Sequence, residues 1–309
     1  MGKTAFIFPG QGSQYAGMGK ELAERFPVAQ ETFAEANEAL GFDLKSLCFN
    51  GPEAELKLTA NTQPCILTVS IAALRVLRNE VGWAADYLAG HSLGEFSALV
   101  AAEAMSFGDA VRMVRMRGQF MQEAVPVGAG GMAAVLGLAR EQVEELCRQA
   151  AQGEVLTPAN FNSPGQIVIS GNLKAVERAI ALAGGMGAKR AVPLPVSAPF
   201  HSPLMEPAGR RLGAELARIE IHDLKAPVVT NVEAEPNTSK ERVRDLLIRQ
   251  VSSPVRWEDS MNRMIELGTV RFVEIGPGKV LAGLLRRIDG TREAFNLEDL
   301  ASLGQLKGA

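Results

Sequence analysis

The chain has 309 residues, 22% charged and 47% hydrophobic, so it can bury a large core in one domain or two. A formal net charge of −3 argues against binding to a phosphate backbone as the main function, because such proteins carry a basic excess. The cysteines, Cys48, Cys65 and Cys147, are widely spaced and odd in number, which indicates neither a disulfide framework nor a metal cluster.

The first apolar run, Thr4 to Phe8, is typical of a buried strand. It begins so near Met1 that we expect no signal peptide, and no apolar run approaches membrane-spanning length. We therefore expect a soluble cytoplasmic protein. The glycine-rich loop from Pro9 to Gln14 follows this strand, where the loops of α/β folds face ligands. It lacks the spacing of dinucleotide and phosphate loops, so it is either a surface of backbone donors or a plain turn.

Residues 17 to 60 are expected to form short helices and loops. From Gln63 to Glu80 apolar residues recur with helical spacing, which predicts a helix with Pro64 in its first turn and Gly82 after its end. A strand follows this helix, as in the alternation of α/β proteins.

That second strand, Tyr87 to Gly90, runs directly into Gly90-x-Ser92-x-Gly94, and a helix is predicted after it. Strand, tight turn and helix around G-x-S-x-G form a nucleophile elbow, in which the glycines permit a sharp bend. Ser92 would then lie at a helix N-terminus, where unpaired N–H groups favour a developing negative charge. Ser92 is therefore a candidate nucleophile. The alternative is a plain turn, since the motif arises by chance in a chain with 31 glycines.

The next helix is predicted from Phe107 to Ala124, with Ser106 at its N-terminus in an S-x-x-D capping signal. Arg117 lies at the centre of its apolar stripe, whereas Arg112 and Arg115 lie on the solvated side. A guanidinium on a buried face is costly unless it meets an anion. That anion is either a structural carboxylate of the protein or the carboxylate of a substrate, held by the planar fork of the arginine.

Residues 128 to 197 change in character and predict an inserted domain. The expected elements are a strand (Met132 to Leu138), a helix (Arg140 to Ala151), two strands (Val155 to Phe161 and Gln166 to Ser170), a helix (Leu173 to Gly184) and a strand (Lys189 to Pro195). This βαββαβ order is the ferredoxin-like unit, and Asn162 to Gly165 is typical of a tight hairpin turn. The larger α/β domain would then consist of residues 1–127 and 198–309.

Only three histidines are present, so the candidates for a general base are few. His91 is adjacent to Ser92, and adjacent side chains at an elbow diverge, so we expect it to support the loop. His222 has polar neighbours and is expected at the surface. His201 follows the inserted domain directly, and a serine nucleophile needs a base of this kind, so His201 is the candidate base.

The remaining residues return to α/β alternation. We expect a strand at Pro227 to Val232, a helix at Lys240 to Val251, a strand at Val270 to Ile275 and a helix at Val280 to Ile288. No internal repeat is present, and the residues from Thr291 onward are expected to be loosely held.

These motifs together closely resemble the malonyl-CoA:acyl-carrier-protein transacylases of bacterial type II fatty acid synthesis and the related acyltransferase domains of polyketide and animal fatty acid synthases. The resemblance covers nearly the whole chain. It is carried by Phe8–Gln14, Thr62–Pro64, Gly90–Glu95, Arg117–Gln122, Asn162–Gln166 and Glu274–Leu281. It implies an α/β-hydrolase-like large domain with an inserted ferredoxin-like small domain, which agrees with the pattern of elements.

The resemblance also implies a role for each candidate residue. Ser92 would attack the thioester of malonyl-CoA with His201 as general base. The backbone N–H groups of Gln11 and Leu93 would form the oxyanion hole. The backbone carbonyl of Gln250 would orient His201, which makes a Ser-His dyad without a carboxylate. The acyl group would then pass to the phosphopantetheine thiol of holo acyl carrier protein in ping-pong fashion.

For Arg117 the resemblance implies a pair with the malonyl carboxylate. Phe200, directly before His201, implies malonyl rather than methylmalonyl, because its bulk would crowd a 2-methyl branch. The polyketide pattern for malonyl has His-Ala before this phenylalanine, whereas this chain has Ala198-Pro199.

Alternative functions are a serine hydrolase or thioesterase, a polyketide-type acyltransferase for another acyl-CoA, and a carrier-protein scaffold with a relict site. We expect no cofactor, no metal, no nucleic acid, no membrane and a monomer. Basic residues that could receive an acidic carrier protein are Lys189, Arg190, Arg286 and Arg287.

Overall fold

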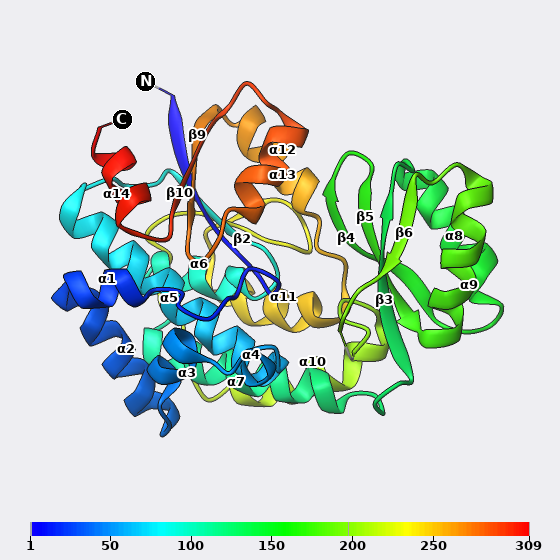
Figure 1. Ribbon diagram of the computed structural model, residues 1–309, viewed down its shortest axis with the longest axis horizontal. Helices are drawn as coiled ribbons and strands as arrows, with labels where there is room; N and C mark the ends of the chain where they lie inside the picture. Colours follow the sequence, from blue (N-terminus) through cyan, green and yellow to red (C-terminus); the bar gives the residue numbers. More distant parts are fainter. Residues whose placement is uncertain (1, 197, 309) are drawn as a thin grey trace.

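The computed structural model describes residues 2–196 and 198–308, which build two parts, each on its own sheet (Figure 1). The larger part holds a six-stranded sheet in the order β10-β9-β1-β2-β7-β8. Its strands are β1 (Lys3–Phe8), β2 (Tyr87–Gly90), β7 (Val228–Val229), β8 (Pro236–Asn237), β9 (Thr269–Ile275) and β10 (Glu293–Leu297). All neighbours pair in parallel except β7 and β8. The predicted α/β class, with a separate smaller domain, is confirmed.

The central pair of strands sets the position of two loops. Phe8 at the end of β1 is in register with Gly90 at the end of β2, and the N–H of His91 donates to the Phe8 carbonyl at 3.0 Å. Because both strands run in the same direction, the glycine-rich loop and the Ser92 turn leave the same edge of the sheet side by side. This is the edge at which open α/β sheets bind ligands.

Helices cover both faces of the large sheet (Figure 1). The alternation of β1 explains how: Phe6 and Phe8 pack into the core under α5, whereas Ala5 and Ile7 pack into a second core with α12 and α13. The helices are α1 (Lys20–Arg25), α2 (Pro27–Leu40), α3 (Leu44–Asn50), α4 (Glu53–Leu56), α5 (Thr59–Glu80), α6 (Gly94–Ala101), α7 (Phe107–Glu123), α10 (Glu206–Leu216), α11 (Lys240–Ser252), α12 (Trp257–Glu266), α13 (Val280–Ile288) and α14 (Leu300–Lys307), with a short 3₁₀ turn at Pro203–Met205. No helix in the described ranges is long and apolar enough to cross a bilayer.

The smaller part follows the predicted ferredoxin-like order. It contains β3 (Gly130–Leu136), α8 (Arg140–Ala151), β4 (Leu156–Ser163), β5 (Gln166–Asn172), α9 (Leu173–Ala183), a 3₁₀ turn (Gly184–Met186) and β6 (Arg190–Pro193). Its four strands are antiparallel in the order β4-β5-β3-β6, and α8 and α9 bury a separate apolar core against them. Pro164 and Gly165 form the predicted hairpin turn, with Gly165 at φ +69°. The domain division at 127/128 and 197/198 stays a prediction, and residue 197 lies outside the described residues.

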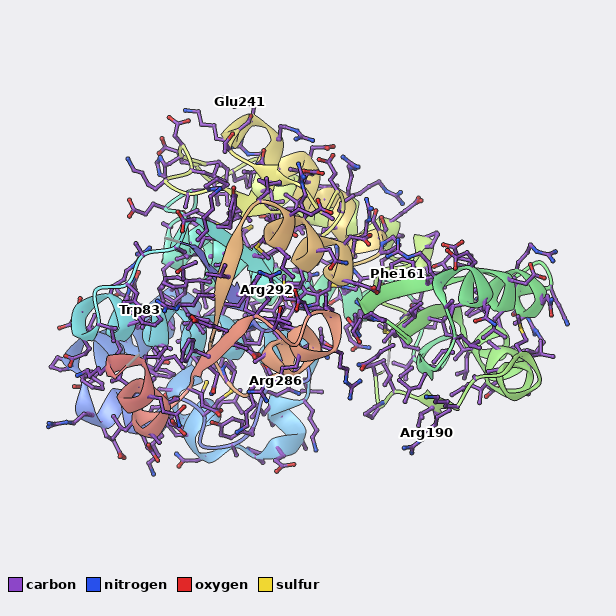
Figure 2. All side chains as sticks on the ribbon, turned by 90° about the horizontal axis from the view of Figure 1, so that it is seen from above. Trp83, Phe161, Arg190, Glu241, Arg286 and Arg292 are labelled. Atoms are coloured by element: carbon purple, nitrogen blue, oxygen red, sulfur yellow. The ribbon has the colours of Figure 1, made fainter. Side chains whose placement is uncertain are left out.

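The two parts are joined by backbone as well as side chains. The Val255 carbonyl accepts from the N–H of Phe161 at 2.9 Å, and the N–H of Val255 donates to the Ala159 carbonyl at 2.8 Å. Arg140 on α8 forms an ion pair with Asp259 on α12 at 2.8 Å, and its guanidinium lies 4.2 Å from the ring centre of Phe161. Figure 2 shows Phe161 where the small part meets the large one. These contacts tie β4 to the segment that precedes α12.

Three expectations from the sequence were wrong. The residues after Thr291 are not loosely held, because β10 extends the sheet beside β9 and Leu297, Leu303 and Leu306 are buried. The ring of Phe295 also packs edge-on against Trp83 at 6.0 Å between centroids. The strand expected at Pro227–Val232 shortens to β7, since Thr230 already bonds back to Glu235 in a turn.

The third error concerns α5, which begins at Thr59, so Pro64 lies inside the helix rather than in its first turn. The start of α5 packs closely against α7 at Gly118. A side-chain carbon added at Gly118 of α7 would lie 2.6 Å from the Thr59 carbonyl oxygen, so only glycine fits between these helices.

Gly118→Ala should therefore lower the stability of the protein by about 1–3 kcal/mol, because the helices must separate. Gly283→Ala is the matched control, since this α13 glycine has no atom within 4 Å of the added carbon. The control should gain about 0.5–1 kcal/mol from helix propensity. Thermal denaturation measures both, and equal shifts in the two variants would contradict the close packing of α5 and α7.

Candidate active site

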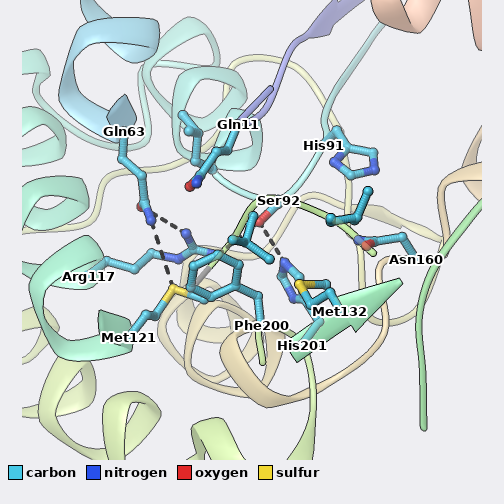
Figure 3. A pocket seen from close by; sticks show the side chains of 13 residues that line it. Gln11, Gln63, His91, Ser92, Arg117, Met121, Met132, Asn160, Phe200 and His201 are labelled. Carbon is cyan, nitrogen blue, oxygen red and sulfur yellow. Dashed lines mark hydrogen bonds between the residues drawn. The ribbon is translucent and has the colours of Figure 1, made fainter. Parts of the chain in front are cut away.

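A cavity opens where β1 and β2 end, between the large and small parts (Figure 3). Ser92 lies at its centre, with Arg117 on one side and His201 on the other. The small part closes it through Met132 of β3 and Asn160 of β4. The site is therefore assembled from both parts of the chain.

The turn that carries Ser92 is held in a conformation that only its glycines allow. Ser92 itself has φ +52°, in the left-handed region. A side-chain carbon at Gly90 would lie 1.9 Å from the Gly94 backbone, and one at Gly94 would lie 2.2 Å from the Phe8 carbonyl oxygen. The predicted strand, sharp turn and helix are present, so this segment has the geometry of a nucleophile elbow.

Ser92 and His201 lie within hydrogen-bond distance. The Ser92 hydroxyl donates to Nε2 of His201 at 2.7 Å. On the other side of the ring, Nδ1 donates to the backbone oxygen of Gln250 at 2.9 Å and to that of Ser253 at 3.2 Å. Because carbonyl oxygens only accept, they hold the proton on Nδ1 and leave Nε2 free to take the serine proton. Backbone carbonyls occupy the place that a carboxylate takes in a Ser-His-Asp triad.

The environment of His201 keeps the ring neutral. Burial, together with the nearby positive charge of Arg117, lowers the pKa of His201 to about 3, while the hydrogen bond to the carbonyl of Gln250 acts in the opposite direction. A neutral imidazole at physiological pH is the form that a general base needs.

Arg117 is a buried cation, only 1% exposed. Its Nη1 donates to the side-chain oxygen of Gln63 at 2.8 Å, and its Nη2 donates to the side-chain oxygen of Gln250 at 2.9 Å and to the Ser92 hydroxyl at 3.1 Å. Its Nε has no partner among the described residues. Burial lowers the pKa of Arg117 to about 10, which leaves it charged at neutral pH.

No carboxylate in the described part of the chain lies within ion-pair distance of Arg117; the nearest charge that acts on it is Glu95. Of the two anions that the sequence left open, a structural carboxylate thus makes no direct ion pair with Arg117 within the described residues. A positive charge beside the serine, with neutral amides as its direct neighbours, can pair with the anion of a ligand.

The two residues expected to supply backbone donors line the same cavity. Gln11 follows β1 and Leu93 follows Ser92, and both line the site. Within the described ranges neither backbone N–H has a hydrogen-bond acceptor, whereas the N–H of Ser92 donates to the side chain of Asn231 at 2.7 Å. Two unpaired N–H groups next to a serine can stabilise an oxyanion.

The other histidines lie as expected. His91 is half-buried, and its Nε2 lies 2.9 Å from the side-chain oxygen of Asn162 on β4, a contact between the elbow and the small part. His222 is exposed, away from Ser92.

The sequence reasoning missed several polar residues behind the site. Gln63, Glu95 and Asn231 are buried around Ser92 and Arg117, and the side chain of Gln250 contacts Arg117 in addition to the expected backbone role. Gln63 and Glu95 belong to motifs that carried the resemblance, but neither motif indicates a contact with Arg117. The described residues contain no group of three or more potential metal ligands.

Comparison with known proteins agrees with this chemistry. Residues 5–308 match the family model described as acyl transferase domain. The chain is 50% identical to the malonyl CoA-acyl carrier protein transacylase of Escherichia coli K12 over 303 residues, 98% of each chain. It is 49% identical to an acyl carrier protein S-malonyltransferase from Vibrio cholerae O1, whose crystal structure it matches with a TM-score of 0.96 over 99% of this chain and 100% of that one.

A second similar solved structure is a type II polyketide acyl-carrier protein in complex with its malonyl-transacylase. The chain is 47% identical to it, with a TM-score of 0.97 and 99% of both chains covered.

The pKa of His201 predicts the pH dependence of Ser92 reactivity. Since the lowered pKa keeps the base neutral, labelling of Ser92 by a fluorophosphonate should stay nearly constant from about pH 8 down to about pH 5, where an ordinary histidine has already lost its base form. Intact mass after timed labelling measures this rate, with His201→Asn as the unreactive control. A loss of reactivity centred near pH 6.5, the ordinary value, would contradict a desolvated His201.

Proposed function

The chain belongs to the acyl transferase family, and from this premise we propose that it transfers the malonyl group of malonyl-CoA to acyl carrier protein for fatty acid synthesis. The reaction passes through a malonyl ester on Ser92. The observation that carries the proposal is a serine hydroxyl bonded to both a neutral imidazole and a buried guanidinium that has no carboxylate of the described residues at ion-pair distance.

The first half-reaction follows from the distances around Ser92. As Oγ attacks the thioester carbonyl, its proton passes to Nε2 of His201, 2.7 Å away. The carbonyl oxygen becomes an oxyanion, which the N–H groups of Gln11 and Leu93 stabilise. Collapse of this intermediate breaks the carbon–sulfur bond, and His201 returns the proton to the leaving thiolate of coenzyme A.

The second half-reaction repeats these steps with the carrier protein. His201 takes the proton of the phosphopantetheine thiol, whose sulfur attacks the malonyl ester. The same two N–H groups stabilise the second oxyanion, and Ser92 leaves with a proton from His201. No step needs a metal or a resident cofactor, and coenzyme A enters only as part of the substrate.

Selection of the acyl group is assigned to Arg117 and to the apolar wall around it. The guanidinium lies beside Ser92, so it can hold the free carboxylate while the thioester carbon lies at the hydroxyl. Phe200, Met121 and Met132 line the same cavity (Figure 3). The bulk of Phe200 next to His201 leaves little room for a 2-methyl branch, which favours malonyl over methylmalonyl.

The acidic carrier protein is expected to approach over basic side chains beside the cavity. Lys189, Arg190, Arg286 and Arg287 are all exposed. Figure 2 shows Arg286 on the large part and Arg190 on the small part, so a docked carrier protein would span both. Arg287 also reaches across to the side chain of Gln166.

We place the reaction in the cytoplasm and expect the enzyme to act as a monomer. Cys48, Cys65 and Cys147 are buried free thiols, as is usual in a reducing compartment. The site is complete within one chain, since Ser92, His201, Gln11 and Arg117 meet in a single cavity.

Intact mass spectrometry tests the function directly. After brief mixing with malonyl-CoA, the enzyme should gain one malonyl group, and this group should move to holo acyl carrier protein when the latter is added. Ser92→Ala is the control and should acquire no adduct. Loss of the adduct to water at the same rate with or without the carrier would show a hydrolase, and absence of any adduct would leave only a scaffold function.

Arg117→Ala should separate carboxylate recognition from catalysis. Malonyl transfer should fall roughly 10²- to 10⁴-fold, because a buried charge pair with the substrate is lost. Acetyl transfer should be spared or improved, since acetyl has no carboxylate. Arg112→Ala, on the exposed side of α7, is the matched control and should change neither rate. Steady-state rates with both acyl-CoAs measure the effect, and an equal loss for both would refute the carboxylate clamp.

A further inference from the structure

A fully buried carboxylate lies directly behind the catalytic residues. Glu95 is 2% exposed and occupies the first turn of α6, three residues after Ser92. A single carboxylate oxygen, Oε2, accepts two hydrogen bonds: one from the backbone N–H of Asn231 at 3.0 Å and one from Nε2 of Gln250 at 2.8 Å. The mechanism above assigns Glu95 no role, although burying a carboxyl group is costly.

The bond from Gln250 to Glu95 determines which way the Gln250 amide points. Its Nε2 also donates to the backbone oxygen of Ser92 at 2.9 Å, so both of its protons meet oxygen acceptors. The amide oxygen must then face the other way, where it accepts from Nη2 of Arg117 at 2.9 Å. Without the acceptor at Glu95, the amide would lose one of the three contacts that hold it in this orientation.

A second path from Glu95 leads to the nucleophile. Asn231, whose backbone Glu95 holds, accepts from the N–H of Ser92 at 2.7 Å and donates to the Gly90 carbonyl at 2.6 Å. The side chain of Asn231 therefore holds the elbow on both sides of its turn, at Gly90 and at Ser92. Through Gln250, Glu95 also reaches the guanidinium that contacts Oγ of Ser92.

We propose that Glu95 is a positioning residue that, through Gln250 and Asn231, fixes the positions of Arg117 and Ser92 relative to each other. The inference rests on the proposed role of Arg117 in binding the malonyl carboxylate. Its effect is on geometry: Glu95 touches neither Arg117 nor Ser92 Oγ, and it sets where the guanidinium lies relative to the attacking oxygen. Selectivity between malonyl and acetyl groups should therefore depend on Glu95.

The two bonds need the Oε2 acceptor rather than the negative charge. Burial raises the pKa of Glu95 to about 7, so both protonation states are populated near neutral pH. A proton on Oε1 leaves Oε2 free to accept both bonds. Glutamine at this position can likewise place its amide oxygen where Oε2 lies, whereas methionine fills similar volume without an effective acceptor.

The test compares Glu95→Gln and Glu95→Met in malonyl and acetyl transfer to holo acyl carrier protein. For Glu95→Met, kcat/KM for malonyl-CoA should fall about 10- to 100-fold, with a smaller fall for acetyl-CoA. Glu95→Gln should keep the selectivity ratio within about threefold of the wild type. A simple loss of folded enzyme would lower both substrates equally.

Glu274 supplies the matched control. It is another buried carboxylate whose pKa burial raises to about 7, but it caps α13 by accepting from the N–H groups of Leu281 and Ala282. Glu274→Met should lower the melting temperature and leave the malonyl-to-acetyl ratio unchanged. If Glu95→Met does not fold, Gln250→Met takes its place in the test. This variant removes the amide that links Glu95 to Arg117 and leaves Glu95 unchanged.

An unchanged ratio in folded Glu95→Met, or in Gln250→Met when the former does not fold, would overturn the positioning role. So would a reduced ratio in Glu95→Gln equal to that in Glu95→Met. Failure of the wild-type enzyme to transfer malonyl at all would instead refute the proposed function, so the two failures are distinguishable.

Discussion

The site depends on one buried positive charge. Arg117 sits at the centre of the apolar face of α7, where a guanidinium is stable only if its donors are satisfied and an anion is at hand. The protein supplies amide oxygens from Gln63 and Gln250 instead of a carboxylate, which holds the group in place without neutralising it. Under the proposed function a substrate carboxylate provides the missing charge, so that binding and selection of the acyl group are the same event.

The same charge shapes the catalytic pair beside it. Arg117 lowers the pKa of His201, which favours the neutral imidazole, and it donates a hydrogen bond to the Ser92 hydroxyl. A carboxylate next to His201 would pair with Arg117 and compete with the substrate. Backbone carbonyls from Gln250 and Ser253 orient the ring without adding a charge. A histidine oriented by carbonyls therefore suits the anionic acyl group of the proposed function.

Residues with local signals could be predicted from the sequence. The elbow of Ser92 follows from glycine spacing between a strand and a helix, and the apolar stripe of α7 places Arg117 in the core. The βαββαβ order likewise predicts the small sheet. Gln63, Asn231 and the side chain of Gln250 carry no such signal, because their roles depend on three distant segments that meet only in the fold. The C-terminal strand was missed for a similar reason, since its partner is the buried edge of β9 rather than a sequence neighbour.

The division of the chain into two sheets explains why the cavity lies between them. The large sheet brings the glycine-rich loop and the elbow together, but it leaves the serine open to solvent at the edge of the sheet. The small sheet covers this opening with Met132 and Asn160, and Asn162 reaches His91 within the elbow itself. The small sheet thus supplies one wall of the cavity that holds Ser92.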